Sequence, residues 1–184
     1  MWSIAGTLTV VPALDRTDLL AEPVARVLSA VDPADAARCG VAEIDPELAD
    51  TAEFCATYSS PLDSSANCVV VLGKREGQQR YAACMILATT RADVNGVVRR
   101  RLDVRKASFA PMDDAVERTG MAYGGITPIG RPEEWPLLID AAVAATPEVV
   151  IGSGVRRSKL FVPGELLAKL PGAEVIEGLA RPVG

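Results

Sequence analysis

Two long apolar segments, residues 67–74 and 80–89, constrain the fold of this 184-residue chain more than any other feature. Both are typical of β-strands, and only the short polar run Arg-Glu-Gly-Gln-Gln separates them. Two such runs joined by a short loop that contains glycine predict a β-hairpin. Because their hydrophobicity is nearly continuous, both faces of the hairpin should be covered, and we expect it at the centre of a sheet.

Further strands and helices are expected on either side of this hairpin. Strands are predicted at residues 2–11, 41–44, 104–110, 137–140, 148–151, 158–162 and 173–177. Helices are predicted at residues 15–31, with a break at Pro23, and at 46–58, 93–102, 111–119, 141–145 and 163–170. The strands outnumber regular β-helix-β crossovers, which favours a mixed α/β sheet over a doubly wound parallel one.

The length of the chain favours a single domain, because 184 residues suffice for one core and are few for two. No apolar run approaches the length that spans a bilayer. The N-terminal segment lacks the basic flank of a secretory signal. We therefore expect a cytoplasmic protein.

The cysteine and histidine content limits the possible chemistry. Cys39, Cys55, Cys68 and Cys84 form no Cys-x-x-Cys pair, so we expect reduced thiols in the core, with a disulfide as the less favoured alternative. The chain has no histidine, which excludes a Ser-His-Asp triad, a Cys-His pair and a histidine-based zinc site. We expect no metal and no cofactor. Hydrolysis would have to use other groups, backbone dipoles or the substrate itself.

The net charge of -5 argues against unselective binding of nucleic acid. The basic residues are nevertheless clustered. One run comprises Arg99, Arg100, Arg101, Arg105 and Lys106, and the other comprises Arg156, Arg157 and Lys159. Each run could be a solvated face, and the two would form a phosphate-binding patch if they met on one side.

A glycine-rich loop, residues 119–130, is the best candidate for a site. Gly120 follows the predicted helix 111–119 and is explained as its C-terminal cap. The cap does not explain the other glycines and Pro128, since one turn needs only one or two such residues. A binding loop and an elaborate turn are both open interpretations of this segment.

Several motifs in order resemble the YbaK/ProX family of aminoacyl-tRNA editing domains. These are residues 66–71, the apolar second strand, Asp-Val-Asn at 93–95, Arg-Lys-Ala at 105–107, Thr-Gly at 119–120, Gly-Gly-Ile-Thr-Pro-Ile-Gly at 124–130, Ile-Asp at 139–140 and Gly-Ser-Gly at 152–154. The similarity covers roughly residues 45–178, and the segment 124–130 is its most specific part. Residues 1–44 would then pack on this core as an N-terminal strand and helices.

The resemblance implies a mixed, largely antiparallel and partly barrel-like sheet with packed helices. It implies a deacylase that hydrolyses the ester of mischarged aminoacyl-tRNA. The loop from Gly124 to Pro128 would surround the aminoacyl end, and its amides would stabilise the oxyanion. A water and the ribose hydroxyl of the substrate would replace a protein base. The implied partner is the 3′ end of aminoacyl-tRNA, with a prolyl-tRNA synthetase acting in trans as a further candidate.

The resemblance assigns two sets of site residues. The implied catalytic residues are Asn67, Gly124, Gly125, Thr127 and Asp140. The implied substrate-binding residues are Tyr123, Ile126, Pro128, Gly130, Gly152, Ser153, Gly154 and Arg156. Active members of the family usually carry a lysine where this chain has Asn67, which can donate hydrogen bonds but has no charge. Lys74 lies past the strand and is not accepted as a substitute.

Structural roles compete with these site roles. Asn67 could satisfy backbone groups at a strand end, and Thr127 is more easily explained as a loop residue than as a nucleophile. Asp140 fits a helix cap somewhat better than a pocket carboxylate. Gly152 and Gly154 could form a turn or contact an oxyanion or phosphate. Asp50 and Thr51 are expected at the surface.

Three functions are compatible with these observations. The leading hypothesis is a free-standing aminoacyl-tRNA deacylase. The second is a member of the same fold that binds charged tRNA or another ligand without hydrolysis, because Asn67 replaces the lysine. The third is a protein that binds a small phosphate compound through the loop amides.

Overall fold

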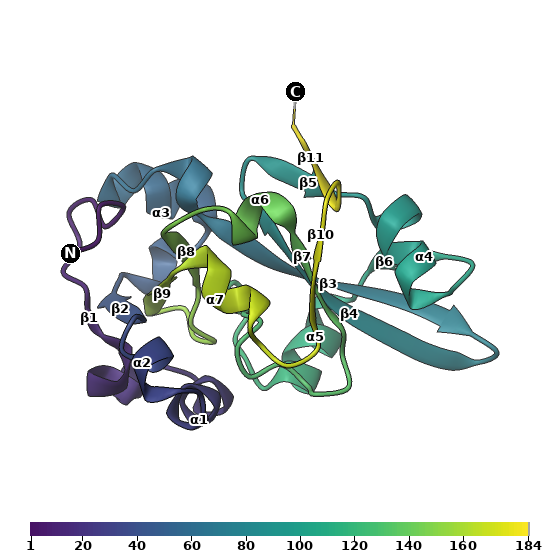
Figure 1. Cartoon of the computed structure of the whole chain (residues 1–184), viewed down its shortest axis with the longest axis horizontal. Coiled ribbons are helices and arrows are strands. Elements are labelled where there is room, and N and C mark those ends of the chain that lie inside the picture. Colours follow the sequence, from purple (N-terminus) through teal and green to yellow (C-terminus); the bar gives the residue numbers. More distant parts are fainter. Residues whose placement is uncertain (184) are drawn as a thin grey trace.

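The predicted hairpin forms the centre of a five-stranded sheet in the computed structural model, which describes residues 1–183 (Figure 1). The hairpin strands are β3 (Ala66–Arg75) and β4 (Gln78–Leu87), and the strand order is β10-β7-β4-β3-β6. β7 (Leu137–Asp140) runs parallel to β4, and β10 (Ala173–Ile176) runs parallel to β7. β6 (Ala107–Phe109) is antiparallel to β3. The prediction of a central hairpin is therefore confirmed.

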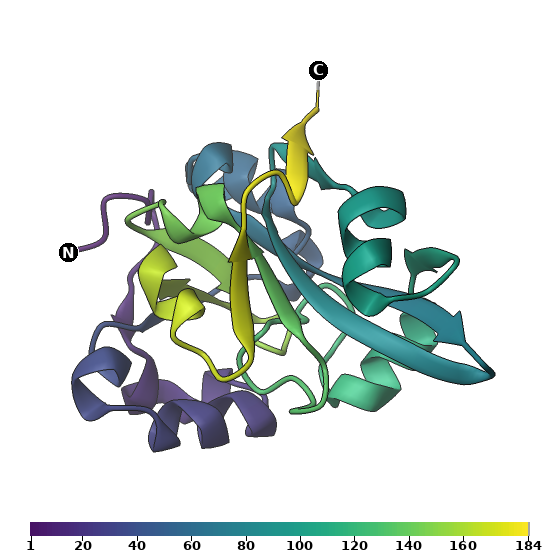
Figure 2. The same cartoon turned by 45° about the vertical axis from the view of Figure 1, so that its right-hand side comes forward.

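Both faces of the hairpin are covered, which explains its continuous apolar sequence. Val71 and Ala82 pack with Val98 and Leu102 on one face, the face of α4 (Arg99–Leu102). Val70 and Tyr81 pack on the opposite face with Ala115 and Trp135. Ala115 belongs to α5 (Met112–Thr119), and Figure 2 shows α4 and α5 on either side of the hairpin.

A second sheet has four antiparallel strands in the order β1-β2-β9-β8. Its strands are β1 (Val11–Pro12), β2 (Gly40–Glu43), β9 (Ser158–Val162) and β8 (Val149–Gly152). A parallel bridge between Ser65 and Val150 joins the two sheets where β3 begins. β5 (Thr90–Ala92) and β11 (Ala180–Pro182) form a short antiparallel pair. The expected mixed and largely antiparallel α/β class is confirmed.

The helices are short and fill the spaces around the sheets. They are α1 (Glu22–Ala30), α2 (Pro33–Ala36), α3 (Thr51–Tyr58), α4, α5, α6 (Ala141–Ala144) and α7 (Gly164–Ala168). Three 3-10 helices span Ala13–Leu19, Pro46–Leu48 and Leu62–Ser64, and a π-helix, Val94–Val98, leads into α4. Pro23 lies in the first turn of α1, so the predicted break in the first helical segment is correct. No helix within residues 1–183 is long and apolar enough to cross a membrane.

The first strand was predicted too long. Only Val11 and Pro12 pair with β2, and residues 1–10 form turns and irregular structure. Gly6 has a φ of 59°, a left-handed conformation that ends any extended run. Ile4 and Ala5 are nevertheless buried beside Phe54 and Phe161, so the apolar pattern reflects packing rather than sheet pairing.

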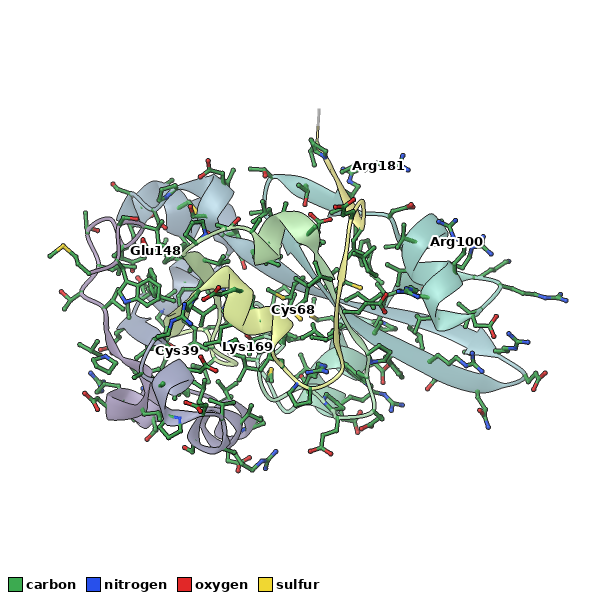
Figure 3. All side chains as sticks on the ribbon, viewed as in Figure 1. Cys39, Cys68, Arg100, Glu148, Lys169 and Arg181 are labelled. Carbon is green, nitrogen blue, oxygen red and sulfur yellow. The ribbon has the colours of Figure 1, made fainter. Side chains whose placement is uncertain are left out.

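The cysteine prediction is confirmed. All four cysteines are free thiols, and Cys39, Cys55 and Cys84 are buried. Cys68 is partly buried near the middle of the molecule (Figure 3). Burial raises the pKa of Cys68 to about 12, so its thiol is protonated at neutral pH and is a poor nucleophile.

Candidate functional site

A cavity of about 440 Å³ lies where the two sheets meet. Its walls come from the start of β3, the end of β8, the first turns of α3 and α5, and the glycine-rich loop. The lining residues are Ala49, Asp50, Thr51, Phe54, Ser65, Ala66, Asn67, Cys68, Val69, Met112, Tyr123, Gly124, Ile126, Val150, Ile151, Gly152 and Lys159. Its volume is within the range of small-molecule sites, and it combines apolar walls with a few polar groups.

Part of the predicted loop faces this cavity. The loop makes a turn in which the Gly125 amide donates to the Ala122 carbonyl oxygen at 2.9 Å. Gly124 has a φ of 76° at the third position of the turn, a conformation that glycine adopts without steric cost. Tyr123, Gly124 and Ile126 line the cavity. Within residues 1–183 the amides of Gly124 and Ile126 have no hydrogen-bond partner, so both can donate to a ligand.

Gly125 does not have the position that its expected role requires. Its amide is used in the turn, and its carbonyl oxygen accepts from the Gly154 amide at 2.7 Å. A Cβ atom on Gly125 would lie 2.7 Å from the Val155 carbonyl oxygen, whereas one on Gly152 would lie 2.6 Å from the Gly125 carbonyl oxygen. Gly125 and Gly152 therefore allow two backbone segments to approach each other. Only Gly152 also lines the cavity.

Asn67 lies in the cavity wall at the start of β3, as its expected site role requires. The Thr51 hydroxyl donates to the Asn67 side-chain oxygen at 2.9 Å, which fixes the amide and leaves its NH₂ group available. Asp50 and Thr51 both line the cavity. Asp50 is exposed, as expected, whereas Thr51 is partly buried. The sequence placed them inside one long helix, but α3 begins at Thr51, and its first turn faces the cavity.

A buried lysine in the same cavity was not identified as a site residue from the sequence. Lys159 on β9 is only 7% exposed, and its Nζ donates to the Ala49 carbonyl oxygen at 2.7 Å. An ammonium group has three donors, and the other two have no acceptor within residues 1–183. Burial lowers the pKa of Lys159 to about 8, although nearby Asp50 partly opposes this shift. The group still carries its charge at pH 7.

The sequence did contain a signal for Lys159. It is the only charged residue within β9, and the other four residues of that strand are buried. Lysine is rarely buried without a paired charge, so a lysine inside an apolar strand indicates a functional site. Phe54, whose ring centroid lies 5.4 Å from the Lys159 ammonium, was also not predicted as a site residue.

Arg156 holds the rim of the cavity together. Its Nε donates to the Pro46 carbonyl oxygen and its Nη1 to the Tyr123 carbonyl oxygen, both at 3.1 Å. The same Nη1 lies 3.5 Å from an Asp50 carboxylate oxygen. A Cβ atom on Gly124 would lie 2.3 Å from the guanidinium, so glycine at that position leaves room for Arg156. Arg156 is therefore next to the site without lining it.

Asp140 lies outside the cavity and caps a helix. It is 5% exposed, and its carboxylate accepts from the Ala142 amide at 3.3 Å and from the Ala180 amide at 3.2 Å. These contacts hold α6 and β11 at the end of β7. The contact with the Ala142 amide agrees with the helix-cap interpretation, and Asp140 does not line the cavity in which the catalytic residues were expected.

Five other predicted site residues also lie outside the cavity: Thr127, Pro128, Gly130, Ser153 and Gly154. Thr127 and Pro128 are buried residues of the loop itself, and the Thr127 amide donates to the Met121 sulfur at 3.4 Å. The Gly154 carbonyl oxygen accepts from the Ala122 amide at 2.9 Å. The Ser153 hydroxyl donates to the Ser158 carbonyl oxygen at 3.2 Å. These contacts stabilise the loop on the side away from the cavity lining.

Gly130 has a packing role that the sequence did not reveal. Its φ is 91°, and a Cβ atom there would lie 2.7 Å from the Pro23 backbone. Glycine is therefore needed where the end of the loop passes α1. The segment 124–130 thus combines cavity residues at its start with packing residues at its end.

Comparison with solved structures identifies the fold. A candidate trans-editing enzyme for prolyl tRNA synthetase matches with a TM-score of 0.69 and 22% identity, over 86% of this chain and 97% of that one. The hypothetical protein APE2540 matches with a TM-score of 0.73 and 19% identity, over 87% and 100% of the two chains. A candidate signal transduction protein from Marinobacter aquaeolei VT8 matches with a TM-score of 0.56 and 14% identity, over 86% and 30%. The same fold therefore also occurs as a part of a larger chain.

The chain therefore has a fold that also occurs in a candidate trans-editing enzyme. The family model of the aminoacyl-tRNA editing domain matches residues 45–170, more than half of the chain. The chain belongs to this family, as its motifs indicated.

Proposed function

We propose that this protein is a trans-acting deacylase that hydrolyses the ester of mischarged aminoacyl-tRNA. One observation carries the proposal: Lys159, Gly124 and Ile126 line the same cavity, and within residues 1–183 the two backbone amides have no hydrogen-bond partner. An ammonium group and two unpaired N–H groups can stabilise an oxyanion. Membership of the editing family supplies the substrate class.

The reaction needs no nucleophile from the protein. A water molecule attacks the ester carbonyl carbon, and the C–O bond to the ribose breaks. The hydroxide part of the water stays on the acyl carbon, and its proton passes to the leaving ribose oxygen through the neighbouring ribose hydroxyl. Free amino acid and tRNA are the products. This scheme fits a chain without histidine and a cavity whose cysteine, Cys68, is protonated.

Each polar group of the cavity has a distinct part in this scheme. The Gly124 and Ile126 amides donate to the carbonyl oxygen as it becomes negative. Lys159 provides a positive charge for the oxyanion or for the terminal phosphate, in place of the lysine that Asn67 replaces. Asn67, held by Thr51, positions the ribose through its NH₂ group. The apolar walls, including Phe54 and Ile126, contact the amino-acid side chain.

The direct test is a panel of mischarged tRNAs incubated with the protein, with loss of the ester as the readout. We expect accelerated hydrolysis for at least one amino acid and a loss of about a hundredfold in kcat/KM for Lys159→Met. Lys169→Met is the matched control, because that lysine is exposed and lies outside the cavity.

The assay also separates the alternative functions. Absence of acceleration for every amino acid at high enzyme concentration would overturn the proposal. Saturable binding of charged tRNA without hydrolysis would instead identify a non-catalytic member of the fold. A prolyl-tRNA synthetase acting in trans is the candidate protein partner, and its addition to the assay tests whether it raises the rate.

A further inference from the structure

The positive charge of this chain is concentrated in one segment. Residues 74–106 contain nine lysines and arginines and three acidic residues, a formal charge of +6, while the whole chain carries -5. The remainder therefore carries -11. The first basic run lies on this segment, at the opposite end of the molecule from β9 (Figure 1), so the two basic runs do not form one patch.

Cations at the tip of the β3–β4 hairpin extend this run to a larger basic surface, which we call the basic end. It consists of Lys74, Arg75, Arg80, Arg99, Arg100, Arg101, Arg105 and Lys106. Lys74 and Arg105 line two neighbouring surface hollows, one shared with Lys106 and the other with Arg99. Arg75 lines the second hollow as well, so five cations from β3, α4 and the segment before β6 converge there.

Most of these cations have no acidic partner. Arg75 and Arg80 share the Asp103 carboxylate, and Arg101 pairs with Glu174. Within residues 1–183 the other five have no carboxylate within 4.0 Å: Lys74, Arg99, Arg100, Arg105 and Lys106. Arg100 lies on the outer side of α4 (Figure 3). Unpaired exposed cations in such density repel each other and favour a polyanion as ligand.

Strand β3 connects the basic end to the cavity. Asn67 lies in the cavity wall, and Lys74 lies near the other end of the same strand. The seven-residue step between them corresponds to roughly 23 Å. A ligand that reaches both must therefore be long as well as anionic.

We propose that the basic end binds the phosphate backbone of the tRNA body while the 3′ end occupies the cavity. The inference deepens the proposed function, because it assigns the surface that recognises the tRNA beyond its aminoacyl end. Double-helical RNA is recognised mainly through its shape and phosphates, which suits a cluster of cations that have no acidic partner. The acidic remainder of the chain repels RNA and so orients it towards this end.

The test compares binding of uncharged tRNA by two triple variants with equal net charge. Lys74→Ala/Arg105→Ala/Lys106→Ala removes exposed cations of the basic end. Arg26→Ala/Lys169→Ala/Arg181→Ala removes exposed cations elsewhere. We expect the first variant to lose about tenfold or more in affinity at about 0.1 M salt, and its plot of log K against log salt to flatten by about two units. The control should bind like the wild type.

A short aminoacylated oligonucleotide separates this inference from the proposed function. The first variant should hydrolyse it at the wild-type rate but act slowly on full-length aminoacyl-tRNA. Equal tRNA binding by wild type and variant, or no salt-dependent binding by the wild type, would overturn the inference. If the wild type binds tRNA through this end but hydrolyses no ester, the proposed deacylase fails and the tRNA-binding surface stands.

Discussion

The Lys159 ammonium group donates a hydrogen bond to the Ala49 carbonyl oxygen, over a distance of 2.7 Å, just before α3 begins. This contact fixes a positive charge on the wall of the cavity, where burial disfavours it. A buried charge lowers the free energy of unfolding unless another group or a ligand interacts with it. Such a residue is commonly retained because the function of the protein needs it.

Lys159→Met should stabilise the protein at pH 7 by roughly 1–3 kcal/mol, because burial lowers the lysine pKa from 10.5 to about 8. Below pH 8 the folded state bears the full cost of the buried charge. Between pH 8 and 10.5 the folded lysine is neutral while the unfolded one is protonated, so wild-type stability rises and the advantage of the variant shrinks. Urea unfolding at pH 7, 9 and 10.5 measures this trend.

The activity should also depend on pH through Lys159. Enzymatic kcat/KM, corrected for spontaneous ester hydrolysis, should fall above an apparent pKa of about 8 as Lys159 loses its proton. The Lys169→Met control should keep both the profile and the stability of the wild type. A Lys159→Met variant less stable than wild type at pH 7 would contradict this view of the site.

Moving the positive charge from position 159 to position 67 tests whether the cavity needs a single cation at either position. Asn67 and Lys159 line the same cavity from different sheets. Asn67→Lys in the wild type should give no gain in activity, because two ammonium groups in one small cavity repel each other. The same change in Lys159→Met should restore at least part of the lost kcat/KM. Failure of the double variant, together with a gain from Asn67→Lys alone, would show that Lys159 is not the catalytic cation.

Gly125→Ala should lower stability by roughly 1–3 kcal/mol, because its Cβ atom would meet the Val155 backbone. Gly125→Val should lower the free energy of unfolding further, and it should shift the thermal transition strongly or abolish it. Gly120→Ala is the control in the same loop: its Cβ atom would meet nothing within 4 Å, so only its φ of 69° costs about 1 kcal/mol. A Gly125→Ala protein as stable as wild type would contradict the packing role.

Arg156→Ala should loosen the loop without unfolding the protein. The change removes the contacts to the Pro46 and Tyr123 carbonyl oxygens, and the side chain is partly exposed, so we expect at most about 1 kcal/mol of destabilisation. Amide hydrogen exchange of residues 123–126 should become faster, and KM should rise more than kcat falls. Arg26→Ala, an exposed arginine on α1, is the control. Unchanged exchange in this segment would argue against the role of Arg156 at the rim.

Local sequence patterns were sufficient for the central elements of the fold. The continuous apolar runs of β3 and β4 and the short loop between them predicted a covered hairpin, because burial on both faces leaves no alternation. Gly120 was recognised as a cap, and its left-handed φ of 69° after α5 confirms it. The prediction of a strand at residues 2–11 was mostly wrong, because an alternating apolar pattern does not reveal whether a strand edge is available for pairing.

The sequence alone determined the class of the sheet, the hairpin at its centre, the free cysteines and the family, since these follow from local periodicity and ordered motifs. Only the tertiary structure decided which residues face the cavity. Gly125 packs against the Val155 backbone instead of lining the cavity. Lys159 lines the same cavity as Asn67, although the two residues are more than 90 positions apart in the chain. The physical reason is that a cavity between two sheets is defined by the packing of distant segments, whose directions no local pattern encodes.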